Sequence, residues 1–135
     1  MSKQLLQPAH WARPKGYANG VAVKVAQGQQ IFVAGMIGWN AQNQFQTDEL
    51  VAQVRQALQN VVEVLAAAGA TPAHITRMTW YLTDKRDNIA RGREIGAAYR
   101  DIIGDFGIAM TAVQVVALIE DRALVEIEVT AVIPE

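Results

Sequence analysis

The feature that most constrains this chain is the strict alternation of residues 123–133. One side of the run is wholly apolar, with Ala123, Val125, Ile127, Val129, Ala131 and Ile133. The other side carries Leu124, Glu126, Glu128, Thr130 and Val132. Successive side chains of a strand lie on opposite faces of its sheet, so this pattern predicts a strand with one buried face. The buried face needs a layer of helices over it.

A second strand is expected just before this one, over residues 110–118, with a charged turn at residues 120–122. Because the two strands are neighbours in sequence, we expect an antiparallel hairpin in which the residue numbers of each opposing pair sum to about 242. Gln114 then lies opposite Glu128, and Val116 opposite Glu126. The polar face of this hairpin, where we expect function, holds Met110, Ala112, Gln114, Glu126 and Glu128.

The rest of the chain alternates between strand and helix signals. The most distinct element is an amphipathic helix over residues 50–65, capped by Thr47 and ended by Gly69. A second helix begins at Asp87 or Asn88 and ends at Gly104. Strands are expected at 21–25, 30–35 and 75–83, with a further edge strand near 3–6.

The resulting order, β-β-α-β-α-β-β, predicts an α+β fold with a mixed sheet and two helices on one face. At 135 residues, of which 51% are hydrophobic, the chain is expected to form one domain over residues 1–135. The second face of the sheet stays uncovered and partly apolar. That exposure is a liability for a monomer and indicates an oligomer that buries it.

Several kinds of chemistry are disfavoured by the residue content. The chain has no Cys, and its two histidines, His10 and His74, share no ligand spacing, so we expect no metal and no cofactor. Ser2 is its one serine, which argues against a serine nucleophile. A net charge of −1 does not favour nucleic acid. No apolar run suits a signal peptide or membrane span, so a cytoplasmic location is expected.

The candidate chemical groups lie on the last strand. A carboxylate within an apolar strand can serve as an acid or base if burial raises its pKa. For Glu128 a solvated or ion-paired position is the favoured interpretation, whereas for Glu126 both interpretations stay open. Trp39 and Trp80 are interpreted as core or interface residues rather than as platforms for a ligand.

Blocks of sequence along nearly the whole chain resemble the Rid family, also called YjgF/YER057c-like or L-PSP endoribonuclease-like. No single block is diagnostic, but their order and spacing together are specific. The blocks are PKGYANG (14–20), FVAGMI (32–37), QxxQALxNV (53–61), AAGA (67–70) followed by Ile75, and EIExxAV (126–132).

This resemblance implies a chorismate-mutase-like α+β fold and a homotrimer whose open sheet faces meet in a central barrel. It also implies small-molecule clefts between adjacent subunits. The best-known members are enamine and imine deaminases, which hydrolyse compounds such as 2-aminoacrylate to keto acids and ammonia.

Carried over residue by residue, the resemblance gives a pocket that is more apolar than that of the deaminases. Met110 stands where the deaminases have an Arg that grips the substrate carboxylate, beside Thr111. A family Ser falls on Ala34, next to Gly35, and a family Cys falls on Ala112. A ligand-binding Tyr and the Glu that positions water are retained as Tyr17 and Glu126. Arg122 is a weak candidate to replace the missing guanidinium.

These substitutions favour a trimer that binds a small metabolite between subunits and is not an efficient 2-aminoacrylate deaminase. The alternative is an enamine or imine hydrolase of altered substrate choice, in which Glu126 acts with a water molecule. A third reading, an interaction protein or a ribonuclease, has less support. The partners expected are therefore further copies of the chain and a small molecule, without nucleic acid or membrane.

Overall fold

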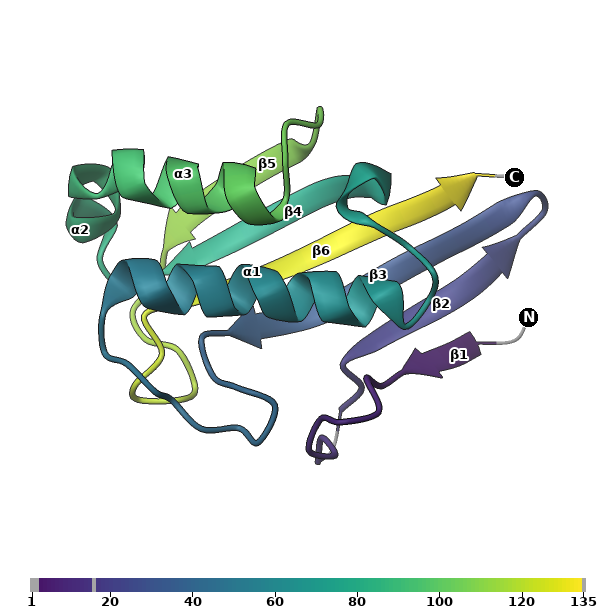
Figure 1. The fold of residues 1–135 in the computed structure, drawn as a ribbon, viewed down its shortest axis with the longest axis horizontal. Coiled ribbons are helices and arrows are strands. Elements are labelled where there is room, and N and C mark those ends of the chain that lie inside the picture. The colour runs from purple at the N-terminus through teal and green to yellow at the C-terminus, as the bar shows by residue number, and fades with distance from the viewer. Residues whose placement is uncertain (1–2, 16, 135) are drawn as a thin grey trace.

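Six strands form one sheet, and the helices gather on one side of it (Figure 1). The computed structural model describes residues 3–15 and 17–134. The strands are β1 (Lys3–Leu6), β2 (Gly20–Val25), β3 (Gly28–Ile37), β4 (Ile75–Leu82), β5 (Ala109–Gln114) and β6 (Val125–Pro134). The helices are α1 (Leu50–Ala66), α2 (Lys85–Ala90) and α3 (Gly92–Ile102), with a 3-10 turn, η1, at Pro72–His74. The predicted α+β class and mixed sheet are confirmed.

The order of strands across the sheet is β1-β2-β3-β6-β4-β5. Every pair is antiparallel except β4–β5, which is parallel. The last strand therefore lies in the middle of the sheet, between β3 and β4, where both of its edges are hydrogen-bonded. Its strict alternation fits this place, because one of its faces is covered by helices and the other is open.

The predicted terminal hairpin is wrong. β5 pairs with β4, not with β6, and residues 115–124 form a connection rather than a tight turn. The chain between β4 and β5, which includes α2 and α3, is the long crossover that parallel neighbours require. The sequence pattern identified both strands but not their neighbours, since alternation says which face a residue lies on and not which strand it pairs with.

This pairing also corrects the predicted functional face. Met110 lies beside Met78, and Ala112 beside Trp80, in the β4–β5 register. Paired residues share a face, so Met110, Ala112 and Gln114 lie on the helix side of the sheet. Glu126 and Glu128 lie on the open side, opposite Tyr81 and Thr79 of β4.

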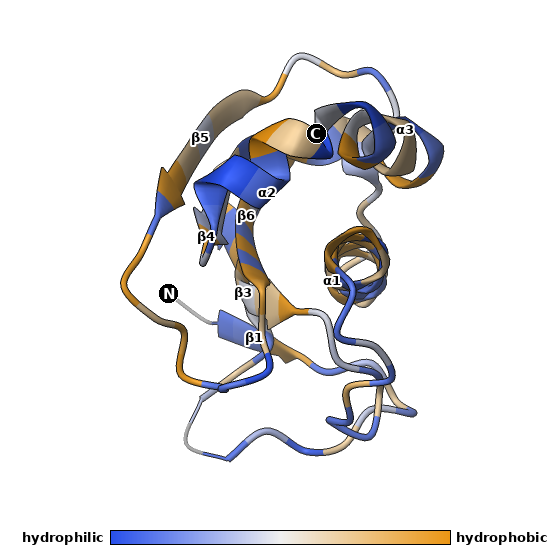
Figure 2. Cartoon of the chain, turned by 90° about the vertical axis from the view of Figure 1, so that its left-hand side faces the viewer, coloured by the Kyte–Doolittle hydropathy of each residue, from blue (hydrophilic) through white to orange (hydrophobic). Residues whose placement is uncertain are grey.

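Helix α1 packs over β3 and β6, and α3 lies on the same side of the sheet (Figure 2). The apolar stripe of α1, with Val54, Leu58 and Val61, is fully buried. Glu49, not Thr47, caps the helix, because its carboxylate accepts from the Ala52 N–H at 2.7 Å. The predicted stop at Gly69 is confirmed: this glycine has φ +76°, and the next N–H, of Ala70, donates to the Leu65 carbonyl at 2.9 Å.

The second predicted helix starts earlier than expected and is broken in two. Asp84 caps α2, with its carboxylate accepting from the N–H groups of Arg86 at 3.0 Å and Asp87 at 3.2 Å. Arg91 leaves the helical conformation, with φ −100° and ψ 18°, and α3 begins at Gly92. The prediction missed Asp84 because the apolar spacing that marks the helix starts only at Ile89.

The open face of the sheet carries several large side chains. Phe32 of β3 and Val113 of β5 are each 42% exposed, and Tyr81 lies on the same face between them in strand order. Met110, which was expected on this face, lies on the other one, as does Trp80.

Across residues 3–15 and 17–134, no helix is long and apolar enough to cross a membrane.

Candidate functional site

The candidate site is built around an irregularity in β3. Its register with β6 shifts between Val33 and Met36, so that Ala34 and Gly35 form a bulge. The Ala34 N–H leaves the strand ladder and donates to the carbonyl of Asn19 at 2.8 Å. Asn19 belongs to the segment between β1 and β2, of which residues 7–15 and 17–19 are described and which we call the arm. A bulge changes the direction in which nearby side chains lie, and bulges are common beside functional sites. Here it joins the arm to the centre of the sheet.

Glu126 of β6 occupies the space that the bulge leaves. A Cβ atom placed on Gly35 would lie 2.7 Å from the Cδ atom of Glu126, closer than carbon atoms normally approach. The absence of a side chain at Gly35 is therefore what allows the Glu126 carboxyl group to lie against the strand backbone. The resemblance named both residues, and the structure brings them into contact.

A cavity of about 330 Å³ lies over this pair. Its walls come from six parts of the chain: the arm, the bulged part of β3, the segment after β3, helix α1, the loop before β6, and β6 itself. The residues that define it include Tyr17, Asn19, Ala34, Gly35, Trp39, Asn60, Ile119, Glu120 and Glu126. The structure thus brings together Tyr17, Ala34, Gly35 and Glu126, four of the seven predicted site residues.

Two asparagines that the sequence analysis did not single out help to hold these walls. Asn60, on the buried face of α1, donates to the carbonyls of Ile37 at 3.0 Å and Trp39 at 2.9 Å. Asn19 donates to the side chain of Gln7 at 2.8 Å. A signal for Asn60 was present, because it lies seven residues from Gln53, and two polar residues at that spacing interrupt one apolar helix face.

The electrostatics of the cavity are negative. Burial, and then the nearby charge of Glu128, raise the pKa of Glu126 above its usual value. Glu120 brings a second carboxylate to the lining, and none of the described residues that line this cavity is Lys, Arg or His. A half-buried carboxyl group with a raised pKa suits proton transfer and the positioning of water. The same surroundings disfavour an anionic ligand.

Glu128 has a different environment although it lies two residues away. Its side chain is exposed and accepts a hydrogen bond from the Tyr81 hydroxyl at 2.5 Å. This bond is the first cause that raises the pKa of Tyr81 above its usual value. Glu128 does not line the cavity, in keeping with the preferred interpretation of a solvated or paired strand residue.

The other three predicted site residues lie elsewhere in the same chain. Met110 and Ala112 line a separate cleft on the helix side of the sheet. Thr111 shares the open face with Thr79, its partner in the register. Within one chain, β5 therefore does not contribute to the cavity that contains Glu126.

Arg122 does not replace the missing guanidinium in this cavity. Its Nε lies 2.9 Å from an Asp48 carboxylate oxygen, and its guanidinium carbon lies 5.5 Å from the Phe45 ring centroid. These contacts hold the side chain in place outside the Glu126 cavity.

The two histidines have local partners. His10 Nε2 lies 3.2 Å from Glu63, and His74 Nδ1 accepts from the Thr71 N–H at 2.9 Å in the turn before β4. Among the described residues, no three His, Cys, Asp or Glu side chains gather as metal ligands do.

Comparison with known protein families shows which family the chain belongs to. Residues 12–133 match the model of the family described as Endoribonuclease L-PSP. The chain belongs to this L-PSP family. The match extends from the arm to all but the last residue of β6, and it includes Tyr17 and Asn19 of the cavity lining.

Relatives of the L-PSP family agree with this assignment. A RutC family protein from Aquifex aeolicus is 32% identical over 103 residues, which cover 76% of this chain and 79% of the relative. The Rid-family protein YyfA from Yersinia pestis, itself described as of unknown function, has a TM-score of 0.79 and 27% identity, covering 96% of this chain and 98% of its own. E. coli TdcF, solved with bound serine, has a TM-score of 0.76 and 25% identity over the same shares. The resemblance to the Rid family is confirmed.

Proposed function

We propose that this L-PSP family member is a homotrimer that binds a small metabolite without a carboxylate group in clefts between its subunits. The Glu126 cavity supplies one wall of the cleft, and Met110 of the partner subunit lies on the other. The observation that carries the proposal is the cavity lining, which holds Glu120 and Glu126 and, among its described residues, no cationic side chain.

The missing cation decides which ligands fit. An Arg side chain binds a carboxylate through two parallel hydrogen bonds and a permanent charge, and the thioether of Met110 offers neither. Losing such a pair in a desolvated cleft costs about 2–5 kcal/mol, or roughly 30-fold to several thousandfold in affinity. A neutral or cationic ligand avoids this loss, and a cation gains from the two carboxylates.

The trimer is supported by the open face of the sheet. Phe32 and Val113 are large apolar residues that stay 42% exposed in the isolated chain, and three sheets that meet face to face bury them. E. coli TdcF, a related chain with bound serine, supports a small ligand. Light scattering tests the assembly: the expected mass is three times the 14.7 kDa of one chain, and a monomeric mass overturns it.

The test of ligand choice is ammonia release from freshly generated 2-aminoacrylate and from neutral cyclic and linear imines, with a Rid deaminase as positive control. We expect no efficient breakdown of 2-aminoacrylate. The variant Met110→Arg restores the guanidinium, and a gain of 2-aminoacrylate turnover in this variant supports the proposal. Efficient turnover of 2-aminoacrylate by the wild-type chain would contradict it.

A second candidate function, hydrolysis of imines that lack a carboxylate, is favoured by Glu126 itself. A carboxyl group with a raised pKa beside a strand bulge is suited to take a proton from a water molecule that attacks an activated imine. Positioning one water contributes much of the catalysis that such a reaction needs. Loss of neutral-imine turnover in Glu126→Gln supports this function, whereas equal turnover in that variant excludes Glu126 as the base.

RNA cleavage, which the family's name mentions, is not proposed. Phosphate groups are bound in proteins by Arg, Lys and backbone N–H groups. The described lining of the Glu126 cavity has carboxylates in place of such cations, and the chain's net charge is −1.

A further inference from the structure

The arm that forms one wall of the Glu126 cavity is fastened to helix α1 by a single carboxylate. Glu63 Oε2 accepts from the Nε1–H of Trp11 at 2.5 Å, and Glu63 Oε1 lies 3.2 Å from His10 Nε2. The two oxygens of one side chain therefore contact two consecutive residues of the arm. This contact joins parts of the chain that are 52 residues apart.

Trp11 carries the contact from α1 to the cavity. It lines the Glu126 cavity together with Tyr17 and Asn19, the other arm residues of the described lining. Its half-buried ring also packs against the hydrophobic core. An indole is large and rigid, and its N–H is its only polar group. Fixing this N–H therefore fixes the orientation of the ring, and with it the shape of the wall.

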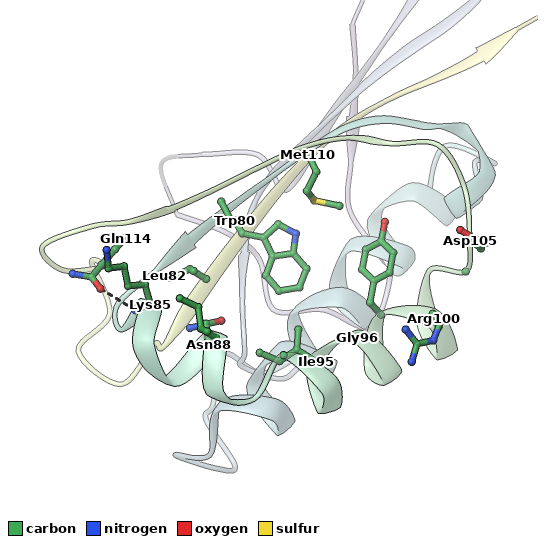
Figure 3. Close-up of a pocket in the computed structure, with 15 residues that line it drawn as sticks. Trp80, Leu82, Lys85, Asn88, Ile95, Gly96, Arg100, Asp105, Met110 and Gln114 are labelled. Carbon is green, nitrogen blue, oxygen red and sulfur yellow. Dashed lines mark hydrogen bonds between the residues drawn. The ribbon is translucent and has the colours of Figure 1, made fainter.

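Glu63 itself is a wall of neither cleft. It lies off the apolar face of α1 and does not line the Glu126 cavity or the cleft at Met110 on the helix side of the sheet (Figure 3). One turn earlier on α1, Asn60 donates to two carbonyls of the segment after β3, which forms another wall of the cavity. Helix α1 thus holds two walls, one through Asn60 and the other through Glu63.

Two main-chain hydrogen bonds also hold the arm. The Ala12 N–H donates to the Ala41 carbonyl at 2.7 Å, and the Asn19 carbonyl accepts from the bulge of β3 at 2.8 Å. These bonds join backbone atoms, which every residue other than proline provides. The bond between Glu63 and Trp11 depends on two particular side chains. It is therefore the anchor that a single substitution can remove while the backbone bonds stay possible.

We propose that Glu63 is a positioning residue for the Glu126 cavity, which it shapes through Trp11, and that the arm opens this cavity when the bond between them breaks. Glu63 touches no ligand in this arrangement, and it acts by setting the population of the closed arm. The inference rests on the proposed function only in treating the cavity as a ligand site.

Release of Trp11 can be measured by digestion with chymotrypsin, which binds an aromatic side chain in its own specificity pocket. When the arm opens and closes faster than it is cut, the rate of cleavage after Trp11 follows the population of the open arm. Glu63→Ala should raise this rate about three- to tenfold, the range that one hydrogen bond gives. An unchanged rate in this variant overturns the proposal.

Glu63→Gln is the conservative variant that separates the hydrogen bond from other effects of the substitution. Its amide oxygen can still accept from the Trp11 N–H, so cleavage after Trp11 should stay close to the rate of the wild type. A rate as high as that of Glu63→Ala would show that a hydrogen bond to Trp11 is not what holds the arm, and would overturn the proposal.

Three controls complete the digestion. His10→Ala removes the exposed partner of Glu63, and Gln59→Ala alters an exposed residue one turn away on the same helix; neither should speed cleavage after Trp11. An effect of His10→Ala as large as that of Glu63→Ala would contradict the role of Trp11. Cleavage after Trp80, which is 7% exposed in β4, measures unfolding of the whole chain. Equal rates after Trp11 and Trp80 would mean that the arm is released only on unfolding, which also overturns the proposal.

The response of the cavity is measured at Trp39, which lines the cavity but lies outside the arm. The chain has three Trp residues, so its nitrogen-15 NMR spectrum has three indole signals, and Trp39→Phe identifies the one from Trp39. This signal should shift in Glu63→Ala and stay in place in His10→Ala. A signal that stays in place in both variants would show that Glu63 holds the arm without shaping the cavity, and would overturn its positioning role.

Neither measurement uses a ligand or a turnover. A chain that binds no small molecule would contradict the proposed function, and the digestion and the Trp39 signal would still decide the role of Glu63. Conversely, an arm that does not respond to Glu63→Ala would overturn this inference and leave the ligand tests of the proposed function unaffected.

Discussion

The carboxyl group of Glu126 lies against Gly35, so close that a methyl group on this glycine would come within 2.7 Å of the Glu126 Cδ atom. One residue belongs to β6 and the other to the bulge of β3. The bulge and Gly35 make room for the Glu126 carboxyl group, and the burial that results is the main cause of its raised pKa. Each can be perturbed separately.

Gly35→Ala should move the Glu126 side chain out of its place. Overpacking of this kind costs about 1–3 kcal/mol of the free energy of unfolding. The matched control is Gly107→Ala, because a Cβ atom there meets nothing within 4 Å, and its stability should change by less than about 1 kcal/mol. Urea unfolding of both variants measures the difference. Equal stabilities would show that the Glu126 side chain can move away from residue 35 without a loss of unfolding free energy.

The stability of the chain should carry a pH dependence that originates at Glu126. Because burial and Glu128 raise the pKa of Glu126 from its ordinary 4.5, the folded state holds the proton more tightly than the unfolded state. The resulting stabilisation is complete below about pH 4.5 and is lost as the pH rises through the raised pKa.

Glu126→Gln removes this titration. Relative to the wild type, the variant should therefore gain stability as the pH is raised from about 4 to about 7. Urea unfolding of both proteins at several pH values measures the trend. A stability difference that stays constant over this range would contradict a raised pKa at Glu126.

The phenol of Tyr81 should titrate at a lower pH once Glu128 is neutral. Ionisation of Tyr81 breaks its hydrogen bond to Glu128 and places two negative charges together, which is why its pKa is raised above 10.0. In Glu128→Gln we expect the pKa of Tyr81 to fall toward that value. Ultraviolet titration, with Tyr81→Phe as the reference for the other tyrosines, measures the change; an unaltered titration argues against the bond.

Gln53 should be among the most sensitive polar residues of the fold. It is fully buried, donates to the carbonyls of Thr47 at 3.0 Å and Arg122 at 2.9 Å, and accepts from the Leu124 N–H at 2.9 Å. Gln53→Leu leaves three backbone groups without partners and should cost about 3 kcal/mol or more. Exposed Gln59, on the same helix, provides the control Gln59→Leu, which should change stability by about 0.5 kcal/mol at most.

The elements with a clear period were predictable from the sequence. Alternation located β4 and β6, and the three- and four-residue spacing located α1, because these patterns follow from the burial of one face. The resemblance to the Rid family added Tyr17, Ala34, Gly35 and Glu126, which line the Glu126 cavity from the arm, β3 and β6. No local pattern joins Tyr17 to Glu126.

The pairing of β5 was not predictable in the same way. Its six residues are all exposed in the isolated chain, so burial gives no signal that tells its two faces apart. Adjacency to β6 in sequence suggested a hairpin, whereas the crossover through α2 and α3 places β5 beside β4. That single difference moved Met110 to the opposite side of the sheet.

The central place of β6 has a consequence for how the chain is made. The strands β1, β2 and β3 form one half of the sheet and β4 and β5 the other, and only β6 hydrogen-bonds to both halves. A ribosome synthesises β6 after all of the others. Until residues 125–134 have left the exit tunnel, the two parts of the sheet cannot be joined, and the edges of β3 and β4 that β6 will cover are open to wrong pairing. The sheet can therefore be completed only after its central strand has been synthesised.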